Sequence, residues 1–162
     1  MKKITLAIVF IALIVIALIC ILYYKHGNEH FPFRCDGQML NQVATPTGNV
    51  ELNAFISVIF TTDRTGIMYT TGSVKDKNTL YTLQRQTFFN INPAPLKGTN
   101  DVYFTHETVH PTDNTPDNLW HNVILPQVNN VKFNVEMKIV NHNALLVRGL
   151  STPFIICVKP YK

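Results

Sequence analysis

Residues 131–139 read Val-Lys-Phe-Asn-Val-Glu-Met-Lys-Ile, with an apolar side chain at every second position. A period of two places the apolar side chains on one face of a β-strand and the polar side chains on the other. A strand with one apolar face is typical of an antiparallel sheet that covers a core on one side only. This stretch therefore predicts an antiparallel β domain.

Strand patterns recur along the rest of the chain. Val50–Phe60 alternates in the same way, although Phe55 and Ile59 make its second face partly apolar. Asp63–Gly66 and Asp76–Asn78 carry the residue types of tight turns. We expect a third turn at Asn141–Asn143 and further strands at Ile67–Val74, Leu80–Ile91, Val102–Val109, Leu145–Leu150 and Phe154–Val158. Roughly seven or eight strands with mostly short connections predict a mainly β fold, as an antiparallel curved sheet or an incomplete barrel.

One short helix is expected between the strands. Asn114 or Thr115 can cap it, Pro116 suits its first turn, and Asp117 complements the helix dipole. Pro126 ends the pattern after two to three turns. A helix this short is not stable alone, so packing of Trp120 must hold it in place.

The N-terminal region has the composition of a membrane span. Ile4–Leu22 carries no charge, and Thr5 is its only residue that is not apolar. A helix of this length measures roughly 28 Å, about the thickness of the hydrocarbon core of a bilayer. Lys2 and Lys3 precede it and only Lys25 follows closely, which favours a cytoplasmic N-terminus. We expect an uncleaved anchor rather than a cleaved signal peptide, because no small-x-small cleavage site follows the span.

These features divide the chain into four parts. We expect a cytoplasmic stub at 1–3, a transmembrane anchor at 4–24, a linker at 25–33 and a periplasmic β domain at 34–162. The chain would then be a single-pass protein of the bacterial inner membrane.

The net charge of +4 arises mainly around the anchor. Without Lys2, Lys3 and Lys25, the 14 basic residues fall to 11, against 10 acidic ones. The external domain is therefore close to neutral, which argues against nucleic acid as its direct partner.

The external domain has two cysteines, Cys35 and Cys157, near its two ends. In an oxidising periplasm such a pair most simply forms one disulfide. The alternative is a pair of buried free thiols. Cys20 lies within the apolar span.

One motif matches the signature of zinc proteases. Residues 106–110 read His-Glu-Thr-Val-His, and that chemistry needs both histidines one turn apart on a helix. The preceding residues favour a strand, and Pro111 biases His110 away from helical geometry. On a strand the two histidines would lie about 13 Å apart. We therefore expect no metal site, no catalytic residues, no cofactor and no enzymatic activity. The six histidines are scattered and most simply ordinary surface residues, with sensing of mild acid as the alternative.

The apolar residues on both faces of Val50–Phe60 have three possible uses. They could belong to the core, which is the default for such a stripe, line a cavity for an apolar ligand, or cover a dimer surface. An incomplete barrel also exposes a strand edge, which could accept a strand from another protein. The sequence names no ligand-binding residues.

Several motifs, each weakly specific alone, together resemble the pattern of a known family. After the single anchor they are Phe33-Arg34-Cys35, Gly66 and Gly72, Arg85, the helix start at Asp113–Asp117, Leu125-Pro126, and Pro153–Cys157. In this combination the chain resembles the FidL-like family of enterobacterial membrane proteins. Within the family it looks most similar to accessory proteins of fimbrial operons.

The resemblance implies a regulatory role. Such proteins are usually partnered with a ToxR-like membrane-bound transcription regulator, and the small partner, similar in role to ToxS, stabilises or activates the regulator's periplasmic domain. In related pairs the two periplasmic domains jointly form a lipocalin-like barrel that can bind bile-salt-like amphiphiles. The family offers no catalytic motif, and Cys35 and Cys157 are the only positions to which it gives a role, a structural one.

The leading hypothesis is therefore an accessory subunit of a ToxR-like regulator of a fimbrial or adhesin operon. Residues 1–3 are too few to bind DNA, so any effect on transcription must pass through another protein. One alternative is a chaperone-like assembly factor that binds pilin by strand addition. The other is a binding protein for an apolar ligand that needs no partner.

Overall fold

The computed structural model describes residues 2–26, 33–46, 48–126, 131–141, 143–149 and 153–159. The chain forms two compact units, Met1–Phe31 and Pro32–Lys162. Of the predicted linker at 25–33, residues 27–32 lie outside the described part.

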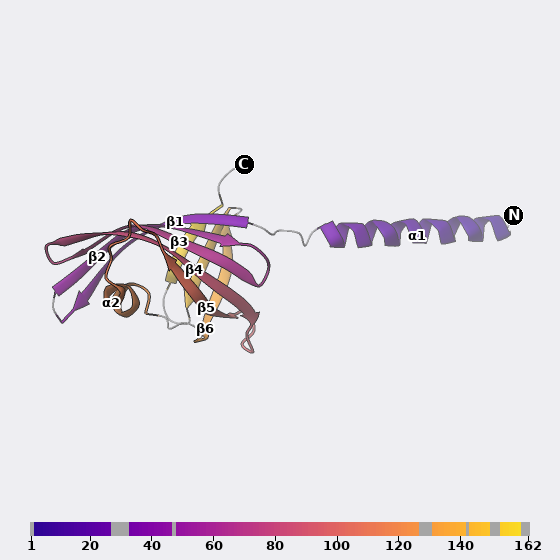
Figure 1. Ribbon diagram of the computed structural model, residues 1–162. Helices are drawn as coiled ribbons and strands as arrows, with labels where there is room; N and C mark the ends of the chain where they lie inside the picture. Colours follow the sequence, from indigo (N-terminus) through magenta and orange to yellow (C-terminus); the bar gives the residue numbers. More distant parts are fainter. Residues whose placement is uncertain are drawn as a thin grey trace. The chain divides into compact units, whose positions relative to one another are not determined.

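The first unit is the helix α1, Lys2–His26 (Figure 1). Apolar residues without glycine or proline fill its middle, and the side chains of residues 10–22 are all exposed. In the described part of the chain, no helix is both long enough and apolar enough to cross a membrane.

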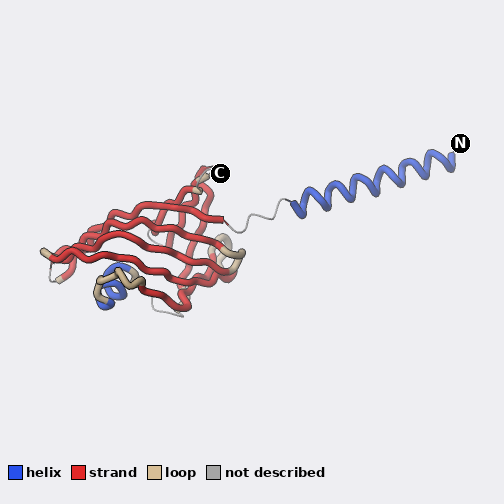
Figure 2. The backbone as a smooth tube through the Cα atoms, turned by 45° about the horizontal axis from the view of Figure 1, so that its top comes forward, coloured by secondary structure: helices blue, strands red, loops and turns tan. Residues whose placement is uncertain are grey.

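The second unit is an eight-stranded antiparallel barrel, drawn in red in Figure 2. Each strand pairs with the next along the chain, and the last pairs with the first. The strands are β1 Phe33–Thr45, β2 Gly48–Phe60, β3 Thr65–Asp76, β4 Thr79–Pro93, β5 Asn100–Val109, β6 Phe133–Asn141, β7 Ala144–Gly149 and β8 Pro153–Val158. The predicted mainly β, antiparallel fold is confirmed.

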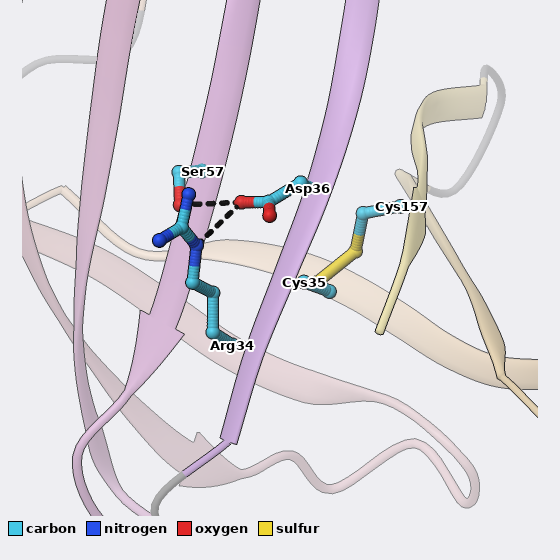
Figure 3. Close-up of a disulfide and its surroundings, with 5 residues drawn as sticks. All are labelled: Arg34, Cys35, Asp36, Ser57 and Cys157. Atoms are coloured by element: carbon cyan, nitrogen blue, oxygen red, sulfur yellow. Dashed lines mark hydrogen bonds and ion pairs between the residues drawn. A yellow bond between two sulfur atoms is a disulfide. The ribbon is translucent and has the colours of Figure 1, made fainter. Parts of the chain in front are cut away.

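Closure is the point at which the barrel differs from the expectation of an incomplete one. Among the described residues, β8 pairs with β1 only at Val158 and Asp36. The disulfide between Cys35 and Cys157 joins the same two strands, with their Cα atoms 5.2 Å apart (Figure 3). The barrel is therefore closed by its own chain. We call the junction of β1 and β8 the seam; there the disulfide supplements very few backbone pairings.

A second weak junction lies between β5 and β6. Only three described residue pairs join them, from Asn100 with Val135 to Val102 with Phe133. Beyond Val102, the described part of β5 pairs with β4 alone. From Glu136 to Val140, β7 is the one strand partner of β6 among the described residues. We call residues 136–140 of this strand the β6 edge.

Two glycines allow the sheet to curve tightly. A Cβ at Gly72 would overlap the backbone of Asn53 on β2, and a Cβ at Gly66 would overlap the ring of Phe89 on β4. Only glycine therefore permits these close approaches.

The predicted helix is present as α2, Asp117–Leu119, continued by the π-helical turn η1, Trp120–Ile124. The predicted caps are wrong: Pro116 is the N-cap residue, and it makes no side-chain capping bond. Asn114 and Thr115 instead bind Thr82 on β4. Asn114 Oδ1 accepts from the Thr82 amide at 2.6 Å, and Thr115 Oγ1 donates to the Thr82 carbonyl oxygen at 3.0 Å. Figures 1 and 2 place the helix on the concave side of the sheet.

The core lies between the inward face of the barrel and this helix. Leu83, Val74 and Ala54 are almost completely buried, and so is Trp120 at 1% exposure. The second unit thus contains the whole described core and its disulfide. It is expected to fold without α1.

Candidate functional site

A cavity of about 150 Å³, partly open to solvent, lies within the barrel. The long strands supply Val58, Phe60, Met68, Phe89, Val102 and Phe104 to its wall. The shorter strands supply Phe133, Val135, Met137, Val147, Phe154 and Ile155. All of these side chains are apolar, so the cavity is suited to a hydrocarbon.

The unequal strand lengths explain why this space is left open. β2 and β4 have 13 and 15 residues, whereas β7 and β8 have 6 each. The short strands cannot cover the whole concave face, and the helix fills only one end of it. Two aromatic pairs line the remaining space. The ring centroids of Phe60 and Phe89 are 5.7 Å apart, and those of Phe104 and Phe133 are 5.3 Å apart.

A second, much smaller hollow of about 20 Å³ adjoins the cavity. It shares Met68 and Phe154 with the cavity and reaches Trp120 on the helix. Thr70 also lines it and is 2% exposed. The hydroxyl of Thr70 is buried without a hydrogen-bond partner among the described residues.

Between the sheet and the helix, a buried arginine gathers several oxygen atoms. Arg85 Nη1 donates to Glu107 Oε1 at 3.1 Å, and its Nε donates to Asp113 Oδ2 at 3.3 Å. Its Nη2 donates to the carbonyl oxygen of Thr115 at 2.7 Å and lies 2.9 Å from Asp117 Oδ1. Burial alone would lower the pKa of Arg85, but the hydrogen bonds to Asp113 and Asp117 outweigh burial and raise it above its ordinary value. The guanidinium therefore stays charged.

The same network holds the helix against the sheet. Trp120 Nε1 donates to Glu107 Oε2 at 2.7 Å, and the Arg85 guanidinium lies 5.3 Å from the Trp120 ring. Asp113 Oδ2 also accepts from the amide of Gln84 on β4 at 2.7 Å. These contacts indicate a structural role.

Potential metal ligands occur beside this network. One ligand atom each of Glu107, Asp117 and His121 lies within 4.8 Å of the others. Arg85 already contacts both carboxylates, and a fixed cation there opposes the binding of a second one. The group therefore fits an ion-pair network better than a metal centre.

The structure separates the histidines of the zinc-protease motif. The motif begins on β5, as expected, and His106 stacks on Phe88 at 4.0 Å. His110 Nδ1 bonds the hydroxyl of Thr112 at 2.8 Å, beyond the end of the strand. Within the described part of the chain, no candidate ligand group brings the two histidines together.

The disulfide site lies at the seam (Figure 3). Cys35 and Cys157 are both fully buried. Next to them, Asp36 accepts from the Ser57 hydroxyl at 2.6 Å and from Arg34 Nε at 2.7 Å. Burial opposes ionisation of Asp36, but these two hydrogen bonds and the charge of Arg34 outweigh it and lower the pKa of Asp36 below its ordinary value.

Sequence reasoning did not identify Thr70 or the Arg85 network. Arg85 interrupts the apolar inward positions of β4, and that position is a signal that could have revealed a buried charge. Thr70 carries no such signal, since threonine is common on either face of a strand.

A family model described as FidL-like putative membrane protein matches residues 72–157. No curated protein matches the chain. The matched residues make up more than half of the 162-residue chain and include β4 to β7, the helix and Cys157. The chain therefore belongs to the FidL-like family of membrane proteins.

Proposed function

We propose that the protein is a membrane-anchored accessory subunit that binds and stabilises or activates a ToxR-like transmembrane transcription regulator of a fimbrial or adhesin operon. Membership of the FidL-like family supports the membrane location. The resemblance to the PsaF/MyfF accessory proteins of fimbrial operons supports the regulatory role. The role is one of binding rather than catalysis.

In this proposal residues 4–24 anchor the chain in the inner membrane and the barrel faces the periplasm. The apolar run from Ile4 to Leu22 and the preceding Lys2 and Lys3 support this orientation. A disulfide between Cys35 and Cys157 is compatible with an oxidising compartment.

The observation that carries the proposal is the β6 edge. On its β5 side this segment has no strand partner among the described residues, and it bears Ile139 and Val140 at 71% and 59% exposure. An open edge with exposed apolar side chains suits pairing with another β domain. The barrel is already closed, so a partner would add to this edge rather than complete a shared barrel. If the barrel binds the active form of the regulator more tightly, it favours that form.

Co-purification tests the partnership. A protein of residues 26–162 is co-expressed with the periplasmic domain of the ToxR-like regulator. We expect one defined complex with a higher melting temperature than either part. Ile139→Lys should abolish it, whereas Leu80→Lys, at a residue of similar exposure (67%) on β4, should not. Two folded proteins that elute separately would refute the partnership.

Pilin assembly by strand addition is the second candidate, because it could use the same edge. It predicts that the barrel captures a pilin subunit lacking one strand. A synthetic peptide of that missing strand should compete with the capture. Binding to the regulator's domain would be unaffected by the peptide.

A further inference from the structure

We propose that the cavity and the adjoining hollow form one binding site for a small neutral hydrophobe. The ligand has about six carbons, as a short chain or a single ring, and one terminal hydroxyl group that bonds Thr70. This inference deepens the sensing side of the proposed function by naming a ligand class, but the site can be measured without any regulator.

The size of the cavity limits the hydrocarbon part. A cavity of about 150 Å³ with an apolar lining accepts a molecule such as benzene. Sites for drug-sized ligands measure about 300–1,000 Å³. The four fused rings of a bile-salt-like amphiphile exceed this volume and would extend out of the open side of the pocket, whereas a six-carbon chain or ring fits within it.

Thr70 supplies a place for the polar end. A side-chain oxygen that is buried and unpartnered carries a desolvation cost that a ligand hydroxyl could remove. The hollow that Thr70 lines measures about 20 Å³, which is room for one oxygen-sized group. Its other walls are apolar side chains and Trp120, whose indole nitrogen already donates to Glu107.

The lining also determines the charge of the ligand. Among the described residues, neither the cavity nor the hollow is lined by a charged side chain. The nearby guanidinium of Arg85 is occupied by Glu107, Asp113 and Asp117. A carboxylate inside would be buried without a counter-ion, which is strongly unfavourable. The site therefore selects alcohols over acids of the same length.

Met68 and Phe154 lie where the two spaces meet, since both side chains line each of them. A ligand that occupies both spaces therefore contacts both side chains. Met68 is unbranched and adapts its shape readily, so it can move aside.

The test uses a protein of residues 32–162 in detergent-free buffer, with thermal shift and chemical-shift titration as the readouts. The probes are 1-hexanol, toluene, hexanoate and cholate at neutral pH. We expect saturable binding of 1-hexanol, weaker binding of toluene, and no binding of the two anions inside the barrel. Absence of 1-hexanol binding, or tighter binding of cholate, would overturn the proposal.

Two pairs of variants locate the site. Thr70→Val should weaken 1-hexanol binding about fivefold and leave toluene unchanged, whereas Thr71→Val on the exposed face should change neither. Val147→Phe should fill the cavity and block both probes, whereas Val140→Phe on the outer surface should not. Unchanged 1-hexanol binding in folded Thr70→Val would exclude the hydroxyl contact. These results do not depend on co-purification with the regulator, so either proposal can fail alone.

Discussion

At the scale of single residues, Thr87 has a buried hydroxyl without a hydrogen-bond partner among the described residues. The residue is 2% exposed and its Oγ1 has no partner in the described part of the chain. Thr87→Val keeps the shape of the side chain and removes the desolvated oxygen. We expect a gain of about 1 kcal/mol in the free energy of unfolding, measured by urea denaturation.

Thr71→Val is the matched control, because Thr71 is exposed on the neighbouring strand. Its effect should stay within about 0.5 kcal/mol. A clear loss of stability in Thr87→Val would mean that the hydroxyl binds a buried water molecule.

Asp36 makes the barrel less stable at low pH. Its pKa is lowered from 3.8 in the folded protein, because hydrogen bonds from Ser57 and Arg34 and the charge of Arg34 overcome burial. The unfolded chain then binds this proton at higher pH than the folded chain does. The stabilisation of the fold by Asp36 is complete above pH 3.8, the pKa of the unfolded chain. It is lost as the pH falls through the lower pKa of the folded protein.

Asp36→Asn should therefore be less stable than the wild type at neutral pH. The difference should shrink below pH 3.8, as urea denaturation across a pH series would reveal. A difference that stays constant from neutral pH to acid would show that Asp36 contributes only packing.

At the scale of elements, Arg85 holds the helix to the sheet through charge. Its side chain and that of Asp113 are each 1% exposed. Arg85→Met should cost about 3–5 kcal/mol, because it leaves the buried carboxylate of Asp113 without its counter-charge. The fluorescence of Trp120, the only tryptophan, should report release of the helix.

Arg148 provides a control with the same kind of ion pair. It contacts Glu136 at 2.6 Å, but its side chain is 52% exposed. Arg148→Met should therefore cost less than about 1 kcal/mol. Equal losses in the two variants would show that burial of Arg85 adds nothing to its contribution.

The elements were largely predictable, because alternation depends only on the local sequence. The alternation over Val50–Phe60 and 131–139 predicted β2 and most of β6 correctly. The helix caps were not predictable, because Asn114 and Thr115 are equally suited to capping a helix or bonding a strand edge. Only the tertiary position of β4 decides between these uses. The predicted turn at Asn141–Asn143 includes His142, which lies outside the described residues.

At the scale of the whole molecule, closure could not be deduced from strand patterns. Closure depends on whether the last strand reaches the first, and no local sequence signal carries that distance. The cavity was not predictable for the same reason, since it results from the mismatch between the long strands β2–β4 and the short strands β7 and β8. Nor did the sequence decide whether Val50–Phe60 lines a cavity, covers a partner surface or belongs to the core. The structure places Val58 and Phe60 at the cavity and Val50 in the core.

The weak seam makes the disulfide the main connection between β1 and β8. The bond closes a loop of 122 residues, and its removal should cost about 4–5 kcal/mol in the chain-entropy model. Replacing Cys35 and Cys157 together by serine tests this, with Cys20→Ser as the control outside the barrel. The double variant should also exchange backbone amides of β1 and β8 faster, while β3 and β4, paired from Thr65 to Asp76, should stay protected. If stability and exchange were unchanged, packing of Ile155 and its neighbours alone would hold the barrel closed, and the seam would not depend on the covalent bond.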